Sequence, residues 1–230
     1  MGDDAAHEAQ VLASWQANAT PWAHAVRARA IESRRLVTDQ AIIEAVRSRA
    51  PRSVLDLGCG EGWLARALSP LGIDVLGLDV VPQLVEAAQR AGGGRFRVGD
   101  YSQLLADAPS GVPRSDAVVC NFALFGAESV VALFRDVPRL LTPGGTFIVQ
   151  TLHPWTAGAE APYRDGWREG SWQGFSSAFH DPPPWYFRTL QSWIQLHSTC
   201  GLRLIELREP QHPASARPAS VIFLSSVAAG

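Results

Sequence analysis

The chain has 230 residues, 47% of them apolar, which is enough for one large domain with a substantial core. Its 20 basic and 22 acidic side chains give a formal charge of −2 and form no block of like charge, so the composition argues against nucleic acid as a partner. The N-terminus lacks the basic-then-apolar order of an export signal, and no apolar run approaches the roughly 20 residues that span a bilayer. We therefore expect a cytoplasmic protein without a membrane partner.

The pattern of apolar residues predicts the elements in chain order. Helices are expected across 5–50, and a fresh helix is expected to begin near Pro21. Strands are then expected at 53–57, 73–78, 95–98, 116–120, 146–151, 202–207 and 219–227, and helices at 62–70, 82–91, 103–106, 128–141 and 189–200. This alternation is typical of a doubly wound, Rossmann-like α/β fold with a mostly parallel, seven-stranded sheet.

Two segments depart from the alternation, and they define the predicted organisation. Residues 1–50 are expected to form an N-terminal helical cap, and 51–230 the core. Within the core, residues 152–188 are an aromatic-rich insertion after the fifth strand. The three cysteines, Cys59, Cys120 and Cys200, are an odd number without metal-like spacing, so we expect reduced thiols and no bound metal.

The first predicted strand ends in a glycine-rich turn, Asp56-Leu57-Gly58-Cys59-Gly60-Glu61-Gly62. Glycines are needed where a strand-to-helix turn adopts positive φ or approaches a ligand closely. Asp79 closes the second strand, where an acid can accept hydrogen bonds from both hydroxyls of a ribose. The turn and Asp79 together indicate a nucleoside site with an unphosphorylated ribose.

A nicotinamide or flavin Rossmann domain is the main alternative for such a turn. Its G-x-G-x-x-G fingerprint requires a third glycine at position 63 when Gly58 and Gly60 are the first two. That position holds Trp63, whose bulk would obstruct close packing of helix on strand. A nucleoside ligand without a pyrophosphate is therefore favoured.

With these motifs in view, the chain resembles the class I S-adenosylmethionine (AdoMet)-dependent methyltransferases of the small-molecule type, with a methyltransferase-11/12-like domain. The resemblance covers about residues 52–150, and it includes Leu140-Leu141-Thr142-Pro143-Gly144-Gly145 as the turn before the fifth strand. It implies AdoMet as cofactor and S-adenosylhomocysteine as product. The positions it assigns to the cofactor are Asp56, Gly58, Cys59, Gly60, Gly62, Asp79, Val80, Asp100, Tyr101, Asn121 and Phe122.

The resemblance also implies that the N-terminal helices cover the cofactor. Trp22 is the candidate for a cation–π contact with the sulfonium, and Arg34 for pairing with the cofactor's carboxylate. A core tryptophan and a solvated arginine are equally compatible with these positions.

By the family's architecture the aromatic insertion lies on the acceptor side. The residues expected to bind the acceptor are Tyr163, Trp167, Trp185 and Tyr186. A dimer surface or a small second core is the alternative for this segment, so both monomer and homodimer stay open. His153, directly after the fifth strand, is the candidate general base if the acceptor must lose a proton, and a hydrogen-bonded structural histidine is the alternative.

The predicted function is methyl transfer from AdoMet to a small-molecule oxygen, nitrogen or carbon by SN2 displacement. The first alternative hypothesis is a non-catalytic AdoMet-binding module, and the second, less favoured by the sequence, is an NAD-dependent reductase.

Overall fold

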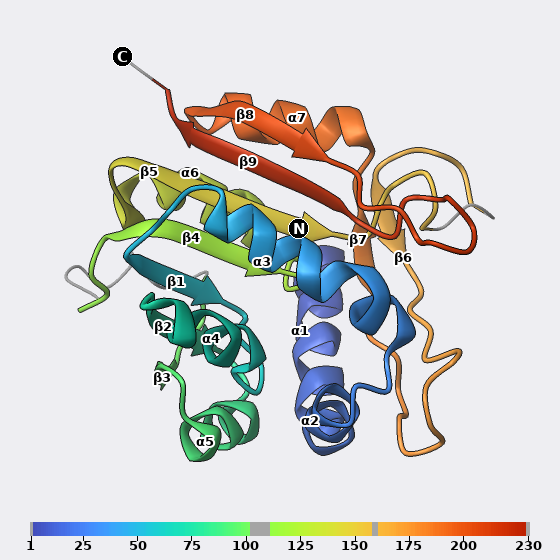
Figure 1. Cartoon of the computed structure of the whole chain (residues 1–230). Helices are drawn as coiled ribbons and strands as arrows, with labels where there is room; N and C mark the ends of the chain where they lie inside the picture. The colour runs from blue at the N-terminus through green and yellow to red at the C-terminus, as the bar shows by residue number, and fades with distance from the viewer. Residues whose placement is uncertain (1, 102–110, 158–160, 229–230) are drawn as a thin grey trace.

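A seven-stranded sheet in the order β3-β2-β1-β4-β5-β9-β8 forms the centre of the protein (Figure 1). The computed structural model describes residues 2–101, 111–157 and 161–228. The strands are β1 (Ser53–Leu57), β2 (Asp74–Asp79), β3 (Arg95–Val98), β4 (Ser115–Asn121), β5 (Leu141–Thr151), β8 (Leu202–Arg208) and β9 (Val221–Val227). The first five pair in parallel, and β9 lies antiparallel between β5 and β8. The predicted fold class is confirmed, whereas the predicted helix at 103–106 lies outside the described residues.

Helices cover both faces of the sheet because the central strands β1, β4 and β5 bury side chains on both sides. One face carries α3 (Asp39–Arg47), α4 (Trp63–Leu68) and α5 (Pro82–Ala91), and the other carries α6 (Glu128–Leu140) and α7 (Leu190–Thr199). A 3₁₀ turn, η2 (Ser69–Leu71), extends α4. No described helix is long and apolar enough to cross a membrane.

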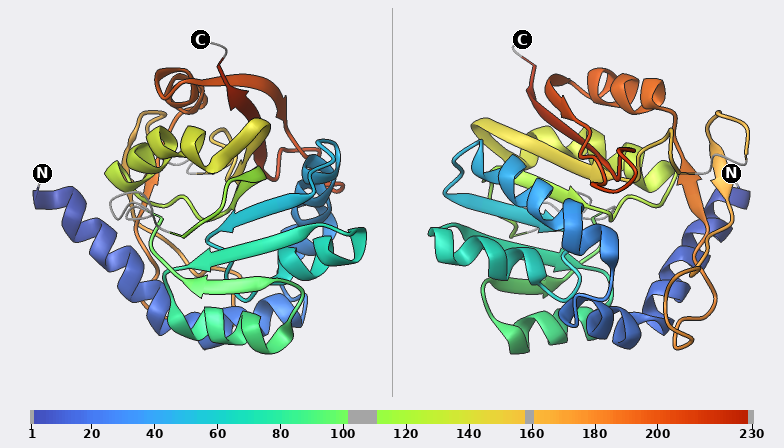
Figure 2. Two further views of the ribbon diagram at one scale, coloured as in Figure 1. Left: turned by 90° about the vertical axis from the view of Figure 1, so that its left-hand side faces the viewer. Right: turned by 45° about the vertical axis from the view of Figure 1, so that its right-hand side comes forward.

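The N-terminal region divides between lid and core. Helices α1 (Gly2–Ala17) and α2 (Ala19–Arg27) lie beyond the carboxyl ends of the parallel strands, as the right-hand view of Figure 2 shows. Ile42, Ala45 and Val46 of α3 are fully buried against the sheet. The cap is therefore shorter than the predicted 1–50, because the apolar stripe of α3 belongs to the main core.

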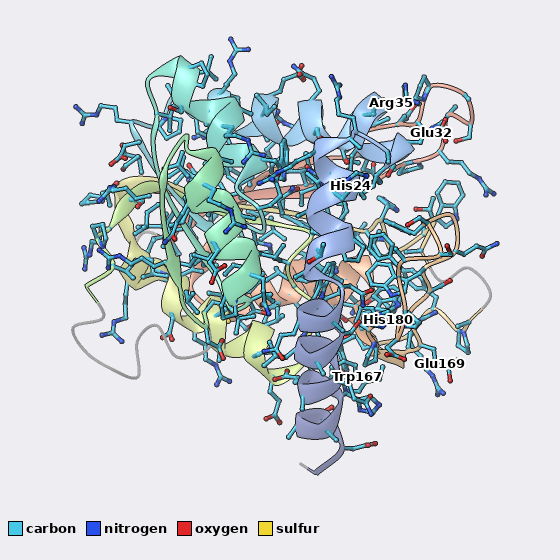
Figure 3. The ribbon with its side chains drawn as sticks, turned by 90° about the horizontal axis from the view of Figure 1, so that it is seen from below. His24, Glu32, Arg35, Trp167, Glu169 and His180 are labelled. Carbon is cyan, nitrogen blue, oxygen red and sulfur yellow. The ribbon has the colours of Figure 1, made fainter. Side chains whose placement is uncertain are left out.

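The aromatic insertion contains a short antiparallel ribbon, β6 (Gly166–Arg168) and β7 (Trp185–Phe187), that the sequence pattern does not predict. Several contacts fasten the insertion to α1. Trp167 stacks on His7 with ring centroids 4.6 Å apart, and Figure 3 shows Trp167 and His180 beside this helix. The buried Asn18 amide bonds His180 in both directions, donating to its carbonyl oxygen (2.8 Å) and accepting from its backbone N–H (3.1 Å). Helices α1 and α2 and residues 163–187 are called the lid below.

Candidate functional site

A cavity of about 590 Å³ lies between the lid and the carboxyl ends of the parallel strands. This volume is in the range of pockets that bind small molecules, roughly 300–1,000 Å³. Its floor consists of the glycine-rich turn after β1 and the residues that end β2, β3 and β4. Open α/β sheets bind ligands at this edge.

The three glycines of the turn have different surroundings. Gly58, Gly60 and Gly62 all have positive φ, at 76°, 56° and 80°. A Cβ on Gly62 would lie 2.8 Å from the Phe96 ring and 2.9 Å from the Ala88 methyl group, and Gly62 does not line the cavity. A Cβ on Gly60 would point into the cavity, where its nearest neighbour is Trp22 Nε1 at 3.8 Å. Gly60 therefore leaves room for a ligand, and Gly62 allows helix and strand to pack closely.

Asp79 holds the turn in place from the end of β2. Its Oδ2 accepts a hydrogen bond from Gly60 N (2.8 Å) and its Oδ1 accepts one from Val81 N (2.9 Å). Burial raises the pKa of this carboxyl, and the backbone N–H donors oppose that rise. The two carboxylate oxygens have four lone pairs between them, more than the backbone donors occupy, and Asp79 lines the cavity.

Asp56 lies beneath the turn. It is 2% exposed and does not line the cavity, so its predicted place beside the cofactor is not supported. Burial, and to a lesser degree the charge of Asp79, raises the pKa of Asp56 to about 7.

A π-helical turn, η1 (Arg34–Thr38), forms another part of the cavity wall. Single π turns occur frequently at functional sites. Arg34 stacks over the Trp63 ring at 4.7 Å and donates from Nε to Asp39 Oδ1 (2.9 Å). Its Nη2 is buried and has no hydrogen-bond partner among the described residues.

Three further buried polar atoms of the cavity lining lack partners within the described part of the chain: Trp15 Nε1, Thr38 Oγ1 and Asn121 Oδ1. Buried polar groups in folded proteins are nearly always hydrogen-bonded. Four such atoms around one cavity indicate a site that a polar ligand completes.

The remaining predicted cofactor positions come together at the same cavity. The lining residues among them are Gly58, Cys59, Val80, Asp100, Tyr101, Asn121, Phe122 and Trp22. Burial raises the pKa of the Cys59 thiol far above its ordinary value, which favours the protonated thiol. Tyr101 is held by a hydrogen bond from its hydroxyl to Ala123 O (3.4 Å).

Aromatic side chains of the lid and of the loop after β4 form the opposite wall. These are Trp15, Trp22, Phe125, Trp172, Phe175 and Trp185. Trp15 is central, with ring centroids 5.1 Å from Trp22, 5.4 Å from Phe125 and 5.8 Å from Trp172.

Three of the four predicted acceptor-binding residues lie outside the cavity lining. Trp167 and Tyr186 are cross-strand partners in the β6–β7 ribbon, with ring centroids 5.6 Å apart. Since side chains alternate along a strand, Tyr186 points away from the cavity that the adjacent Trp185 lines. The exposed Tyr163 accepts a hydrogen bond from Leu190 N (3.0 Å). Those three predictions are therefore not supported.

The surroundings of the His153 side chain indicate a structural role. Leu152 and His153 follow the end of β5, and Leu152 lines the cavity whereas His153 does not. Its Nδ1 accepts a hydrogen bond from Trp155 N (3.1 Å), and its Nε2 lies 2.7 Å from Glu209 Oε1. Both ring nitrogens are occupied, so the predicted role as general base is not supported.

Two acidic residues that the sequence reasoning missed connect the lid to the core. Glu61, whose side chain is fully buried, binds Arg27 of α2 (2.9 Å) and Arg66 of α4 (2.6 Å). Glu8 of α1 accepts hydrogen bonds from Ala127, the residue before α6, and from Ser129 in the first turn of α6. Glu8, Leu12 and Trp15 share one face of α1 and all line the cavity; their i, i+4, i+7 spacing was the available signal.

Comparison with known proteins gives consistent similarities. Residues 55–149, less than half of the chain, match the family model described as a methyltransferase domain. The ubiquinone biosynthesis O-methyltransferase of Xanthomonas campestris pv. campestris (strain B100) is 35% identical over 105 residues, which are 44% of this chain and 43% of the relative. The chain thus aligns with less than half the length of the curated relatives it matches.

Solved structures resemble the chain over a longer stretch. An S-adenosylmethionine dependent methyltransferase from Mesorhizobium loti is 25% identical, with a TM-score of 0.59, covering 79% of this chain and 95% of the other. The glycopeptide N-methyltransferase MtfA, complexed with sinefungin, is 17% identical, with a TM-score of 0.63, covering 83% and 86%. The second likeness concerns the fold alone.

Proposed function

Residues 55–149 form a class I AdoMet-dependent methyltransferase domain, and on that premise we propose that the whole chain transfers a methyl group from AdoMet to a small-molecule acceptor. The observation that carries the proposal is the cavity beside Gly60 and Asp79, four of whose lining residues hold a buried polar atom without a partner in the described chain. Sinefungin, the ligand named for the structure of MtfA, is an AdoMet analogue.

The residues of the cavity fit AdoMet group by group. The free lone pairs of Asp79 suit the ribose hydroxyls, and the exposed Val80 suits one face of adenine, with Asp100 near its amino group. The Arg34 guanidinium suits the carboxylate of the methionine part, because its Nη2 has no partner in the described chain. Gly60 leaves the space beside that part open, and the carboxamide oxygen of Asn121 can accept from its ammonium group.

When bound, AdoMet supplies an electrophilic methyl group on a positively charged sulfur. The chain's own contribution is to orient the two reactants and to exclude water, since displacement at carbon requires a collinear approach. The aromatic wall serves both purposes. Trp22 lies close to Gly60, where its ring can stabilise a sulfonium.

Binding is tested by isothermal titration with S-adenosylhomocysteine and, separately, NADH. We expect only the first to bind, and at 100 times its Kd it should add about 2.7 kcal/mol to the free energy of unfolding, or roughly 5–10 °C in Tm. Asp79→Asn should weaken this binding, and Asp74→Asn, an exposed carboxylate at the other end of β2, is the matched control. Stabilisation by NADH alone would refute the proposal.

Turnover is tested with methyl-labelled AdoMet and a bacterial metabolite extract. A protein-dependent labelled product is expected. Binding of S-adenosylhomocysteine without any labelled product in several extracts would instead favour a non-catalytic AdoMet-binding module.

A further inference from the structure

The cavity has a charged end that the cofactor does not use. Glu8 lies on the lid face of the cavity, next to the loop between β4 and α6. The other acidic residues of the lining are assigned to other interactions. Glu61 is paired with two arginines, and Asp79 and Asp100 lie near the strand ends, where the nucleoside part of AdoMet is proposed to bind. Arg34 is the only basic residue among the described residues of the lining.

One oxygen of Glu8 is fixed and the other is not. Oε1 accepts hydrogen bonds from Ala127 N (3.1 Å), Ser129 N (3.1 Å) and Ser129 Oγ (2.9 Å). These donors belong to the first turn of α6, so the carboxylate also benefits from the helix dipole. Oε2 has no hydrogen-bond partner in the described part of the chain.

Arg188 is a cation in this neighbourhood, but it is turned away from the cavity. It is 5% exposed, does not line the cavity, and donates to the carbonyl oxygens of Gly126 (3.0 Å) and Ala127 (2.7 Å). Its guanidinium and Glu8 therefore bind the same backbone segment, one through its carbonyls and the other through its N–H groups. The two charges interact, and of the two residues only Glu8 lines the cavity.

Aromatic rings continue from Glu8 along the cavity. Trp15 lies two helical turns after Glu8, about 10 Å along α1, and its indole contacts Phe125. The carbonyl of Phe125 accepts a hydrogen bond from Tyr186 N (2.7 Å), which holds β7, and with it Trp185, beside this residue. Aromatic faces combined with a carboxylate are the environment in which proteins bind organic ammonium groups.

We propose, on the basis of the methyltransferase function above, that the acceptor is a cationic amine with an aromatic body. Its ammonium group binds Glu8 Oε2, and its ring lies among Trp15, Phe125 and Trp185. Glu8 thereby selects the acceptor by charge.

The test uses tryptamine and tryptophol, which share the indole-ethyl frame and differ in ammonium against hydroxyl. Each is titrated at pH 7 into protein saturated with S-adenosylhomocysteine. We expect tryptamine to bind at least tenfold more tightly, about 1.4 kcal/mol. Glu8→Gln retains an oxygen for Ala127 and Ser129 but removes the charge, so it should abolish the preference while leaving the Kd of S-adenosylhomocysteine within twofold.

The control variant is Glu128→Gln, which removes the same charge from the exposed first turn of α6, outside the cavity lining, and should leave the preference intact. Failure of S-adenosylhomocysteine to bind would refute the proposed function itself. Three results would overturn only the present inference while S-adenosylhomocysteine binds normally. These are equal binding of both probes, binding of neither probe, and a preference for tryptamine that survives in Glu8→Gln. If Glu8→Gln fails to fold, the wild-type comparison of the two probes decides.

Discussion

Replacing Gly60 and Gly62 separately by alanine should show that the two glycines of one turn have different roles. Gly60 should matter mainly for cofactor affinity, and Gly62 mainly for the free energy of unfolding. Both glycines have positive φ, a conformation that costs an L-residue about 1–2 kcal/mol. At Gly62 the new methyl group would also overlap Phe96 and Ala88, and overpacking of a core adds about 1–3 kcal/mol. We therefore expect a loss of about 2–5 kcal/mol for Gly62→Ala and about 1–2 kcal/mol for Gly60→Ala.

The order of the two variants should reverse for ligand binding. The methyl group of Gly60→Ala enters the cavity, so the Kd of S-adenosylhomocysteine should rise at least tenfold. The Kd of folded Gly62→Ala should stay within about threefold. Urea denaturation measures the first quantity and isothermal titration the second. If Gly60→Ala bound normally while Gly62→Ala lost binding without losing stability, the assignment of the two glycines would be wrong.

Three further substitutions test other parts of the structure. Arg34→Gln should weaken binding of S-adenosylhomocysteine about tenfold or more, but it should leave the Kd of 5′-methylthioadenosine, which lacks the carboxylate, unchanged. The control is Arg35→Gln, at an exposed position of the same turn. Equal losses of affinity for both ligands would contradict the assignment of Arg34 to the carboxylate. His153→Gln should lower Tm but keep methyl transfer within about threefold, and a hundredfold loss would restore the catalytic role. Burial lowers the pKa of His197 to about 4, from about 6.5 in the unfolded chain. Its contribution to the free energy of unfolding is therefore fully present above pH 6.5, and about 3 kcal/mol is lost as the pH falls towards 4. The free energy of unfolding of His197→Leu should depend less on pH over that range, and an unchanged pH dependence would exclude His197 as the cause.

The sequence predicted the sheet and the floor of the cavity because these depend on local signals. Alternating strands and helices specify the fold class, and the ends of parallel strands necessarily converge at one edge. Asp79 is the last residue of β2, Val80 follows it, and Asp100 lies two residues after the end of β3. Asp56 was misplaced because its position in the strand, one residue before the edge, buries it beneath the turn.

The wall of the cavity depends on contacts between distant segments, and for this reason the sequence could not predict it. Whether Trp185 or Tyr186 faces inward is decided by the register of a three-residue ribbon, and such short pairings have no sequence signature. Trp63 was also weaker evidence against a dinucleotide than the sequence suggested. The close packing expected of a third glycine at position 63 is provided by Gly62, one residue earlier. That packing depends on Phe96 and Ala88, which belong to other elements.

The pairing of Asn18 with His180 joins segments 162 residues apart, and it has a consequence for how acceptor preference can be exchanged between homologues. The lid is a discontinuous unit made of residues 2–27 and 163–187, and it is the part of the cavity to which we assign recognition of the acceptor. A chimaera that receives only the insertion of a relative without this tryptophan would lose the hydrogen bond from Trp167 to Asp4 of α1, and its loop backbone would have to meet Asn18 in the same geometry. Specificity should therefore transfer only when both pieces are grafted together, and natural variants should differ in them as a matched pair.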